Sequence, residues 1–512
     1  MRPSQDPKNL GELLSAQAER LPNKVFLFFR ELEVTYRQLD ERANAVANGL
    51  HREGIRKGEA VALLLPNGPE FLYAFFAIVK LGAIAVPLNT QLKASEIGYI
   101  LENSGARCLI AAPQFFDGVR PIRKRCSNLQ LIYQTGERAG EGYLFSGLLA
   151  YPKDFPSVVV DPHDPASLIY TSGTTGRPKG VILSHRNYLS DTEQLCRAAQ
   201  ITASDRFLCI LPLFHVNAQV VTTLAPLLQG GSSILMERFS VKEFFPTLLR
   251  HKATVFSGVP TILAMLLAQR KSGKFDLSSL RFCICGAAPM AVDLFRRFEE
   301  EFRLSILEGY GLSEATCVSS INPVTGKRKI GSIGIPLPQQ AMKVLDEHDH
   351  ERPVGEVGEI AIKGENVMTG YFQDPRSTAE ALRGGWLHTG DLGYRDEEGY
   401  FFIAGRKKEM IIRGGENIYP REIEEALCRH PKVADAAVIG LPDPIWGETV
   451  AAVVIAKADE RPNPEELLEY CRSRLADFKC PTRVFFASEF PRTATGKIQK
   501  LLLRDRYTGE AR

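Results

Sequence analysis

The sequence has no apolar run long enough to cross a bilayer, and it contains no internal repeat or low-complexity tract. Its longest apolar stretch, residues 74–88, is interrupted by Lys80, Gly82 and Pro87 and is too short for a membrane helix. Residues 1–10 are polar without an apolar signal core, and residues 509–512 form no lipidation or peroxisomal signal. These absences favour a protein that works in the cytoplasm.

The chain also lacks an excess of either charge and any pattern of closely spaced cysteines. Its 63 basic and 60 acidic side chains give a formal charge of +3, which offers no electrostatic surface for nucleic acid or an acidic membrane. The 10 cysteines include no Cys-x-x-Cys pair and no Cys/His cluster at zinc spacing, which fits a reducing compartment. Cys283 and Cys285 lie in an apolar run, so we expect them at alternating positions of a strand.

A chain of 512 residues exceeds the size at which one hydrophobic core keeps growing, so two or more domains are expected. Residues 60–65 form a short apolar run, residues 70–81 place apolar side chains at helical spacing, and residues 83–88 form another run. Strand, helix and strand in this order predict a βαβ unit with a parallel sheet. Similar short runs recur at residues 107–112, 232–237 and 281–285. The N-terminal part is therefore predicted to be a large α/β region of stacked subdomains.

The pattern changes near Gly405. Upstream, residues 354–363 and 399–404 are typical of strands and a hairpin. Downstream, helices are expected at residues 420–430 and 464–476, and strands at residues 434–440, 451–456 and 483–487. We therefore expect a large N-terminal domain at residues 1–404, a hinge at residues 405–408 and a small α+β domain at residues 409–512.

A segment rich in glycine and hydroxyl residues, residues 170–180, indicates phosphate binding. It contains Thr171, Ser172, Gly173, Thr174, Thr175, Gly176, Lys179 and Gly180. Glycines let backbone N–H groups approach a polyphosphate, hydroxyls add donors, and the lysine adds a positive charge. It is not a Walker A loop, in which a Gly-Lys-Ser/Thr opens a helix. Loops of this composition also occur as ordinary surface turns.

The residues around this segment predict how it is held. Runs typical of strands, residues 167–170 and 180–183, flank it on both sides, so we expect a hairpin whose loop covers phosphate. Ser184 follows the second run and is a suitable N-cap for the next helix.

The complete string of residues 170–180 resembles the phosphate motif of the adenylate-forming superfamily, which contains acyl-CoA synthetases, peptide-synthetase adenylation domains and firefly luciferase. The resemblance covers nearly the whole chain, because further motifs follow in the family's order. They are residues 211–215, 286–289, 308–314, 386–391, 405–409, 414–417 and 491–497. A match of this extent implies the family's fold and its substrates ATP and coenzyme A, with Mg²⁺ as cofactor.

The resemblance implies which residues bind the nucleotide. Those assigned to ATP are Gly286, Ala287, Ala288 and Pro289 against the adenine, together with Glu308, Gly309, Tyr310, Gly311 and Ser313. Ser313 departs from the family's usual threonine but keeps the hydroxyl. Glu314 would hold Mg²⁺, a hard cation that prefers carboxylate oxygen. Asp391 would accept the ribose hydroxyls, and Arg406 would reach ribose or phosphate.

The same resemblance implies the residues that act on the acyl group. Lys497 would bridge the acyl carboxylate and the α-phosphate during adenylation, and His215 would lie beside that carboxylate. Lys408 aligns with the hinge about which the small domain turns between half-reactions. Gly414 and Gly415 would line the pantetheine tunnel.

On residue type alone, several of these positions could also be ordinary structural or surface residues without a role in the reaction. Lys497 could be a solvated lysine on a loop, and Glu314 a surface residue. Asp391 could cap the turn after Gly390, and His215 could be a satisfied core histidine.

The sequence therefore predicts an ATP-dependent enzyme that activates a carboxylic acid as an acyl-adenylate and passes the acyl group to coenzyme A, releasing AMP and pyrophosphate. Residues 307–314 and 478–481 resemble fatty acyl-CoA ligases and favour a medium- or long-chain fatty acid. Residues 214–239 also resemble carnitine–CoA and coumarate–CoA ligases, so a carnitine-type or aryl acid stays open.

Three other classes remain as alternatives. An adenylating enzyme could load a carrier protein, although no carrier domain follows Lys497. A fatty acyl-AMP ligase would carry an extra insertion, which we do not detect. The intact Lys497, Glu314 and phosphate motif argue against a binding module without activity.

Overall fold

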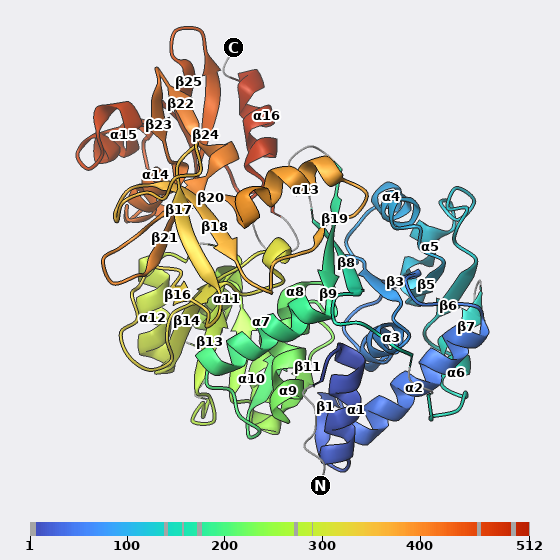
Figure 1. Cartoon of the computed structure of the whole chain (residues 1–512). Helices are drawn as coiled ribbons and strands as arrows, with labels where there is room; N and C mark the ends of the chain where they lie inside the picture. Colours follow the sequence, from blue (N-terminus) through green and yellow to red (C-terminus); the bar gives the residue numbers. More distant parts are fainter. Residues whose placement is uncertain are drawn as a thin grey trace.

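The computed structural model (Figure 1) describes residues 7–137, 142–155, 158–171, 177–270, 275–288, 290–457, 462–492 and 498–510. The predicted βαβ unit is confirmed: β3 (Ala60–Leu64), α3 (Pro69–Lys80) and β4 (Ile84–Pro87), with the two strands parallel. Pro69 opens the helix, where its missing N–H would have no partner in any case. Gly82 turns the chain toward β4 with a φ of 66°, which glycine adopts without strain.

An eight-stranded sheet extends on both sides of this unit. Its order is β19-β9-β8-β4-β3-β5-β6-β7, with antiparallel pairing only at β9 and β19. Its other strands are β5 (Cys108–Ala111), β6 (Leu131–Gln134), β7 (Tyr143–Leu144), β8 (Pro165–Thr171), β9 (Lys179–Ser184) and β19 (Gly370–Tyr371). β8 and β9 form the hairpin predicted on either side of the phosphate motif. The Ser184 hydroxyl accepts the N–H of Asn187 at the start of α7 (His185–Ala198), which confirms the predicted cap.

A nine-stranded sheet forms the other half of the large region. Its order is β16-β15-β14-β13-β12-β10-β11-β1-β2, parallel from β14 to β1 and antiparallel at both ends. The strands are β1 (Val25–Phe29), β2 (Leu32–Thr35), β10 (Arg206–Cys209), β11 (Ser232–Leu235), β12 (Val255–Gly258), β13 (Phe282–Cys285), β14 (Ser305–Tyr310), β15 (Ser320–Ile321) and β16 (Ile335–Pro336). Cys283 and Cys285 alternate on β13 as predicted, and the described residues contain no cluster suited to a metal ion.

The two sheets share one hydrophobic core, so helices and sheets alternate in layers. Side chains of α1 (Leu10–Arg20), α2 (Tyr36–Arg52), α3, α6 (Phe145–Leu148), α7 and α9 (Ala225–Gln229) fill this shared core. The outer face of the nine-stranded sheet packs against α10 (Val241–His251), α11 (Pro260–Arg270) and α12 (Val292–Phe302). The outer face of the eight-stranded sheet packs against α4 (Ala94–Ser104) and α5 (Phe116–Val119). Strands buried on both faces explain the continuous apolar runs in the sequence.

A four-stranded antiparallel sheet follows, and α13 (Pro375–Ala381) lies within this stretch of the chain. Its strands are β17 (Ala341–Leu345), β18 (Gly358–Lys363), β20 (Leu387–Arg395) and β21 (Phe401–Arg406). β18 and β21 correspond to the predicted strands, but β21 runs on to Arg406, which pairs with Asp391 of β20. Arg406 therefore belongs to a strand of the large region.

The C-terminal region has its own sheet and its own two cores. The strands are β22 (Ile411–Arg413), β23 (Glu416–Ile418), β24 (Val433–Asp443), β25 (Gly447–Ala456) and β26 (Arg483–Phe486). α14 (Pro420–Cys428) and α15 (Pro464–Arg472) cover one face, and α16 (Lys500–Glu510) covers the other. The predicted α/β fold, a large N-terminal region with a smaller C-terminal one, is confirmed.

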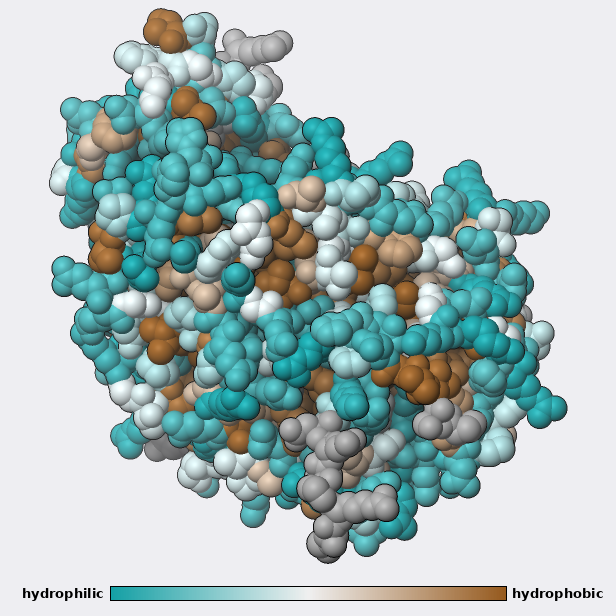
Figure 2. All heavy atoms as spheres, in the orientation of Figure 1, coloured by the Kyte–Doolittle hydropathy of each residue, from teal (hydrophilic) through white to brown (hydrophobic). Residues whose placement is uncertain are grey.

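Figure 1 shows the small region, in orange and red, standing above one side of the large region. Hydrophilic residues cover most of the face drawn in Figure 2, with smaller hydrophobic groups between them. Among the described residues, no helix combines the length and apolar character that crossing a bilayer requires.

A buried carboxyl group lies where the small region meets the large one. Glu308, at the end of β14, is 4% exposed, and burial raises its pKa to about 7. The positive charge of Arg421, on α14 of the small region, acts in the opposite direction. Burial therefore makes the carboxylate form of Glu308 costly, and the charge of Arg421 offsets only part of that cost.

This shift predicts a pH-dependent stability. The folded-state pKa of Glu308, about 7, lies above its ordinary value of 4.5. Protonation of Glu308 therefore stabilises the folded protein fully below pH 4.5, and this contribution to the free energy of unfolding is lost as the pH rises to 7. Glu308→Gln cannot titrate. We expect its melting temperature, relative to the wild type, to rise between about pH 4.5 and 7 and to stay level above. Thermal unfolding of both proteins and of the exposed control Glu300→Gln measures this, and a pH-independent difference for Glu308→Gln would contradict it.

Candidate active site

The carboxyl ends of three parallel strands bring three of the predicted segments together. β10, β12, β13 and β14 pair in parallel, with Cys285 opposite Glu308, so the chain leaves these strands at one edge of the sheet. Residues 211–215 follow β10, residues 286–288 follow β13, and residues 309–314 complete and follow β14. Ligands of α/β sheets bind at such an edge.

Backbone contacts between these segments explain two of the predicted glycines. A Cβ atom on Gly286 would lie 2.9 Å from the carbonyl oxygen of Gly309, and one on Gly311 would lie 1.5 Å from that of Cys317. Ala287 has a φ of 68°, a left-handed conformation that is strained for a residue with a Cβ atom. Such strain persists only where the surroundings fix the backbone, so this edge of the sheet is tightly packed.

Glu314 lies in a short 3₁₀ turn that ends at a strained residue. Thr316 has φ 65° and ψ −66°, and the N–H of Cys317 donates to the carbonyl two residues back at 2.8 Å. This is a γ-turn, which is rare and strained. The Thr316 hydroxyl donates to the carbonyl of Asn366 at 2.6 Å and holds the turn in place. The backbone that carries Glu314 is therefore fixed.

Tyr371 lies between the lysine of the phosphate motif and Glu314. It belongs to β19, which pairs with β9 directly after that motif, and its hydroxyl donates to Glu314 Oε1 at 3.0 Å. Lys179 Nζ lies 5.0 Å from the centroid of the Tyr371 ring and 3.7 Å from Asp374 Oδ2. Burial and the neighbouring Glu314 raise the pKa of the tyrosine hydroxyl, so it stays a donor. The Lys179 ammonium and the Glu314 carboxylate thus both contact Tyr371. A positive and a negative group at this spacing suit a polyphosphate that carries a divalent cation.

The phosphate motif itself is placed by its two ends. Thr171 and Lys179 pair across the hairpin, so the two described ends of the motif lie side by side at its tip. The residues predicted to act there, Ser172, Gly173, Thr174, Thr175 and Gly176, lie outside the described residues, as do Pro289 and Lys497.

Tyr310, Asp391 and Arg406 come from three different motifs and meet in the structure. The Tyr310 hydroxyl donates to Asp391 Oδ2 at 2.6 Å, and Arg406 Nε donates to Asp391 Oδ1 at 2.8 Å. Burial raises the pKa of Tyr310, and the Asp391 carboxylate raises that of Arg406. Asp391 thus acts as an acceptor held by two donors, and it is not a simple turn cap.

His215 caps α8 (Val216–Gln219), which continues into a π-helical turn (Val220–Leu224). Its ring packs against Phe214 with centroids 4.4 Å apart, and its backbone N–H donates to Pro212 at 3.0 Å. The residue as a whole is partly exposed at the carboxyl end of β10, whereas its Nε2 atom is buried. π-helical turns are frequent at functional sites because they widen a helix.

The residues on either side of Lys408 are ion-paired to different regions. Lys407 Nζ lies 3.2 Å from Glu359 of β18, in the large region. Glu409 lies 3.1 Å from Lys500 of α16, in the small region. A change of backbone angles at Lys408 could therefore turn one region against the other while both ion pairs remain.

Gly414 and Gly415 form the two-residue loop between β22 and β23, where Arg413 pairs with Glu416. Their φ values are 59° and 91°, as a type I′ hairpin turn requires at both central positions. A Cβ atom on Gly414 would lie 2.7 Å from the ring of Trp446, whereas one on Gly415 would meet nothing within 4 Å. Turn geometry and the Trp446 contact thus account for the glycines before any ligand is considered.

Tyr371 and Glu359 are site residues that the sequence analysis missed. Tyr371 reaches Glu314 through a two-residue strand that pairs with a segment far away in the sequence, and such pairing leaves no local pattern. Glu359 lies in β18 among four consecutive buried residues, and it accepts the N–H of Gly390 at 3.0 Å beside Asp391. No motif in the sequence marks this carboxylate.

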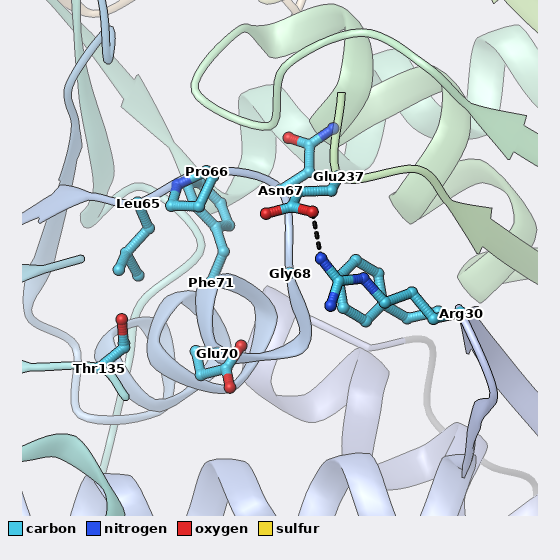
Figure 3. A pocket seen from close by; sticks show the side chains of 10 residues that line it. Arg30, Leu65, Pro66, Asn67, Gly68, Glu70, Phe71, Thr135 and Glu237 are labelled. Atoms are coloured by element: carbon cyan, nitrogen blue, oxygen red, sulfur yellow. Dashed lines mark hydrogen bonds and ion pairs between the residues drawn. The ribbon is translucent and has the colours of Figure 1, made fainter. Parts of the chain in front are cut away.

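A separate pocket of about 160 Å³ lies at the ends of β1, β3 and β11 (Figure 3). Arg30 and Glu237 form an ion pair there, and Asn67 stands beside Glu237. None of the residues that line this pocket is one of the predicted site residues.

Comparisons with known proteins agree with this geometry. A family model for "AMP-binding enzyme" matches residues 14–372, and one for "AMP-binding enzyme C-terminal domain" matches residues 422–497. Sulfoacetate–CoA ligase of Cupriavidus necator is 37% identical over 503 residues, covering 96% of this chain and 97% of its own. Long-chain-fatty-acid–CoA ligase of Bacillus subtilis is 36% identical over 536 residues, covering 98% and 95%.

A solved structure matches over the same length. The crystal structure of an anthranilate CoA ligase in complex with anthranoyl-AMP has a TM-score of 0.92 and 32% sequence identity, covering 98% of each chain. The expected family and enzyme class are thus confirmed: the chain belongs to the AMP-binding, adenylate-forming enzymes and is an AMP-forming acyl-CoA synthetase.

Proposed function

We propose that this ATP-dependent acid–CoA ligase acts on a medium- or long-chain fatty acid. The main support for ATP chemistry is the position of Tyr371. The Lys179 ammonium lies over its ring, and its hydroxyl donates to the Glu314 carboxylate. Similarity to the Bacillus subtilis enzyme supports an aliphatic acid, as do the buried apolar side chains of Val220, Val221 and Leu224 after His215. An aryl acid is the second candidate, because an anthranilate CoA ligase has the same fold over the whole chain.

The nucleotide would lie across the edge where the two large sheets meet. Lys179 and the phosphate motif would hold the β- and γ-phosphates, and residues 286–288 would contact the adenine. Asp391 would accept the ribose hydroxyls in exchange for its present donors, Tyr310 and Arg406. Glu314 suits Mg²⁺, because this cation needs only one or two protein carboxylates beside substrate phosphates and water. The bound cation would neutralise phosphate charge.

In the first half-reaction, a carboxylate oxygen of the acid attacks the α-phosphorus of ATP. The new P–O bond gives the acyl-adenylate, and the bond to pyrophosphate breaks. Two anions must approach each other, so positive charge is needed between them. We assign this role to Lys497, with His215 beside the acyl carboxylate.

In the second half-reaction, the sulfur of coenzyme A, having lost its proton, attacks the acyl carbon and the C–O bond to AMP breaks. One surface cannot serve both steps, so we propose a hinge at residues 405–408 between a large domain, residues 1–404, and a small one, residues 409–512. Gly405 and Arg406 end β21, so the turning point would follow them. The ion pairs of Lys407 and Glu409 support Lys408 as the pivot. The turn of Gly414 and Gly415 would then line the thiol tunnel.

We also propose a cytoplasmic location. All 10 cysteines lie among the described residues, and none of them forms a disulfide. Coenzyme A and ATP are available in the same compartment as reduced thiols.

A panel of acids tests the proposed substrate. Purified protein with ATP, Mg²⁺ and coenzyme A should release AMP fastest with octanoate or palmitate, and more slowly with ferulate, benzoate, carnitine, malonate and sulfoacetate. The apolar segment after His215 is the physical reason, because it would not solvate a second charge. Preference for ferulate or benzoate would support the aryl alternative. Turnover that does not need coenzyme A, or none with any acid, would contradict acyl-CoA formation.

Removal of the adenylation lysine separates the two half-reactions. Lys497→Ala should lower acid-dependent ATP–pyrophosphate exchange by about 10²–10³-fold, because one charge on the developing anion is lost. Thioester formation from chemically prepared acyl-adenylate should stay close to wild type. The exposed Lys457→Ala, in the same region, is the matched control. Equal loss of both half-reactions in Lys497→Ala would refute its assignment.

A further inference from the structure

A chain of buried polar side chains connects the phosphate hairpin to the segment that ends at His215. The Ser167 hydroxyl on β8 lies 2.8 Å from the Tyr188 hydroxyl on α7. The Tyr188 hydroxyl donates to Gln219 Oε1 on α8 at 2.7 Å, and Gln219 Nε2 donates to the carbonyl of Leu213 at 2.8 Å. Ser167, Tyr188 and Gln219 are all 0–2% exposed, so water does not compete for these bonds.

The direction of every bond in this chain is set by its last acceptor. The carbonyl of Leu213 only accepts, so the amide of Gln219 must turn its NH₂ group there and its oxygen toward Tyr188. The Tyr188 hydroxyl donates its single hydrogen to that oxygen. The bond between Ser167 and Tyr188 must therefore be donated by Ser167. Each member therefore has one arrangement, and loss of any one leaves a buried group unsatisfied.

Asn67 also binds this segment through its side-chain amide. Its Oδ1 accepts the N–H of Leu213 at 2.7 Å, and its Nδ2 donates to the carbonyls of Leu211 and Met236, both at 3.0 Å. Asn67 is 4% exposed and stands in the wall of the pocket in Figure 3. Leu213 thus has both its backbone N–H and its carbonyl bound to buried amide side chains.

These contacts link two parts of the candidate site that belong to different sheets. β8 ends at Thr171, where the phosphate motif begins, and Leu213 lies two residues before His215. Apolar side chains of similar shape could fill this space without loss of stability, so stability alone does not require the polar chain. A network with one permitted arrangement fixes a geometry instead.

We propose that Tyr188, Gln219 and Asn67 are positioning residues, which fix the distance and orientation of His215 relative to the phosphate motif. The inference rests on the proposed function, in which both parts act on one acyl phosphate centre. It goes further by naming side chains that contact neither the acid nor ATP and act through the backbone of Leu213.

The test replaces Tyr188 by phenylalanine and compares it with Tyr36→Phe. Tyr36 is also fully buried, and its hydroxyl donates to the carbonyl of Gly231 at 2.8 Å, but it takes no part in the chain. With the best acid of the panel above, Tyr188→Phe should lower kcat/KM for the acid about tenfold in pyrophosphate exchange, while KM for ATP stays within about twofold. Gln219→Glu breaks the chain at another bond and should give the same defect.

A double variant shows whether the effect passes through His215. In the His215→Ala background, Tyr188→Phe should change kcat/KM for the acid less than about twofold, because the residue it positions is gone. A tenfold loss that persists in this background would refute a role through His215. Equal kinetics of Tyr188→Phe and Tyr36→Phe would refute the proposal as a whole.

NMR of labelled histidine tests the same proposal without measuring turnover. In protein labelled at histidine ¹³Cε1, the His215 resonance is identified by its loss in His215→Ala. Tyr188→Phe should move or broaden this resonance, and Tyr36→Phe should leave it in place. If the wild type activates no acid, the proposed function is wrong. The His215 resonance in Tyr188→Phe then tests on its own whether Tyr188 positions His215. An unchanged His215 resonance in Tyr188→Phe contradicts it.

Discussion

The hydrogen bond from Tyr371 to Glu314 joins the two large sheets at the candidate site. Tyr371 belongs to the eight-stranded sheet through the pairing of β19 with β9, and Glu314 follows the last parallel strand of the nine-stranded sheet. The N–H of Met368 adds a backbone bond to the carbonyl of Glu314 at 2.8 Å. Across two sheets that already share one hydrophobic core, these bonds fix the carboxylate that would bind the cation relative to the lysine that would bind phosphate.

The molecule holds its parts with two kinds of contact that differ in cost. The chain through Tyr188 and Gln219 is neutral and fully buried. Loss of one member leaves a buried polar group without a hydrogen bond, which lowers the free energy of unfolding by about 1–3 kcal/mol. The Lys407 side chain beside the hinge is 52% exposed, and pairs of this kind contribute about 0–1 kcal/mol. The buried chain in the large region is thus costlier to break than the Lys407–Glu359 pair beside the proposed hinge.

Much of the fold could be predicted from the sequence because it depends on local patterns. β3, α3 and β4 follow from apolar spacing with Pro69 and Gly82 at the boundaries, and Ser184 follows from its capping chemistry. The meeting of Tyr310 with Asp391 follows only from the family resemblance, since 81 residues separate them. Tyr371 and the Tyr188 chain could not be predicted, because each depends on side chains from elements that pack together only in the folded molecule.

Two glycine positions show how a residue assigned to a ligand site can have another physical cause. Gly414 and Gly415 were expected at a ligand tunnel, and the structure requires them first for a type I′ turn against Trp446. Sequence patterns identify such residues but do not separate a turn requirement from a contact with a ligand.

The central claim is that the acid is adenylated before coenzyme A reacts. In a single-turnover experiment, protein in excess over ATP is mixed with the acid and Mg²⁺, and coenzyme A is added later. The account predicts pyrophosphate and enzyme-bound acyl-AMP before the addition, and AMP with acyl-CoA after it. Release of ADP and phosphate, or of pyrophosphate only once coenzyme A is present, would contradict it.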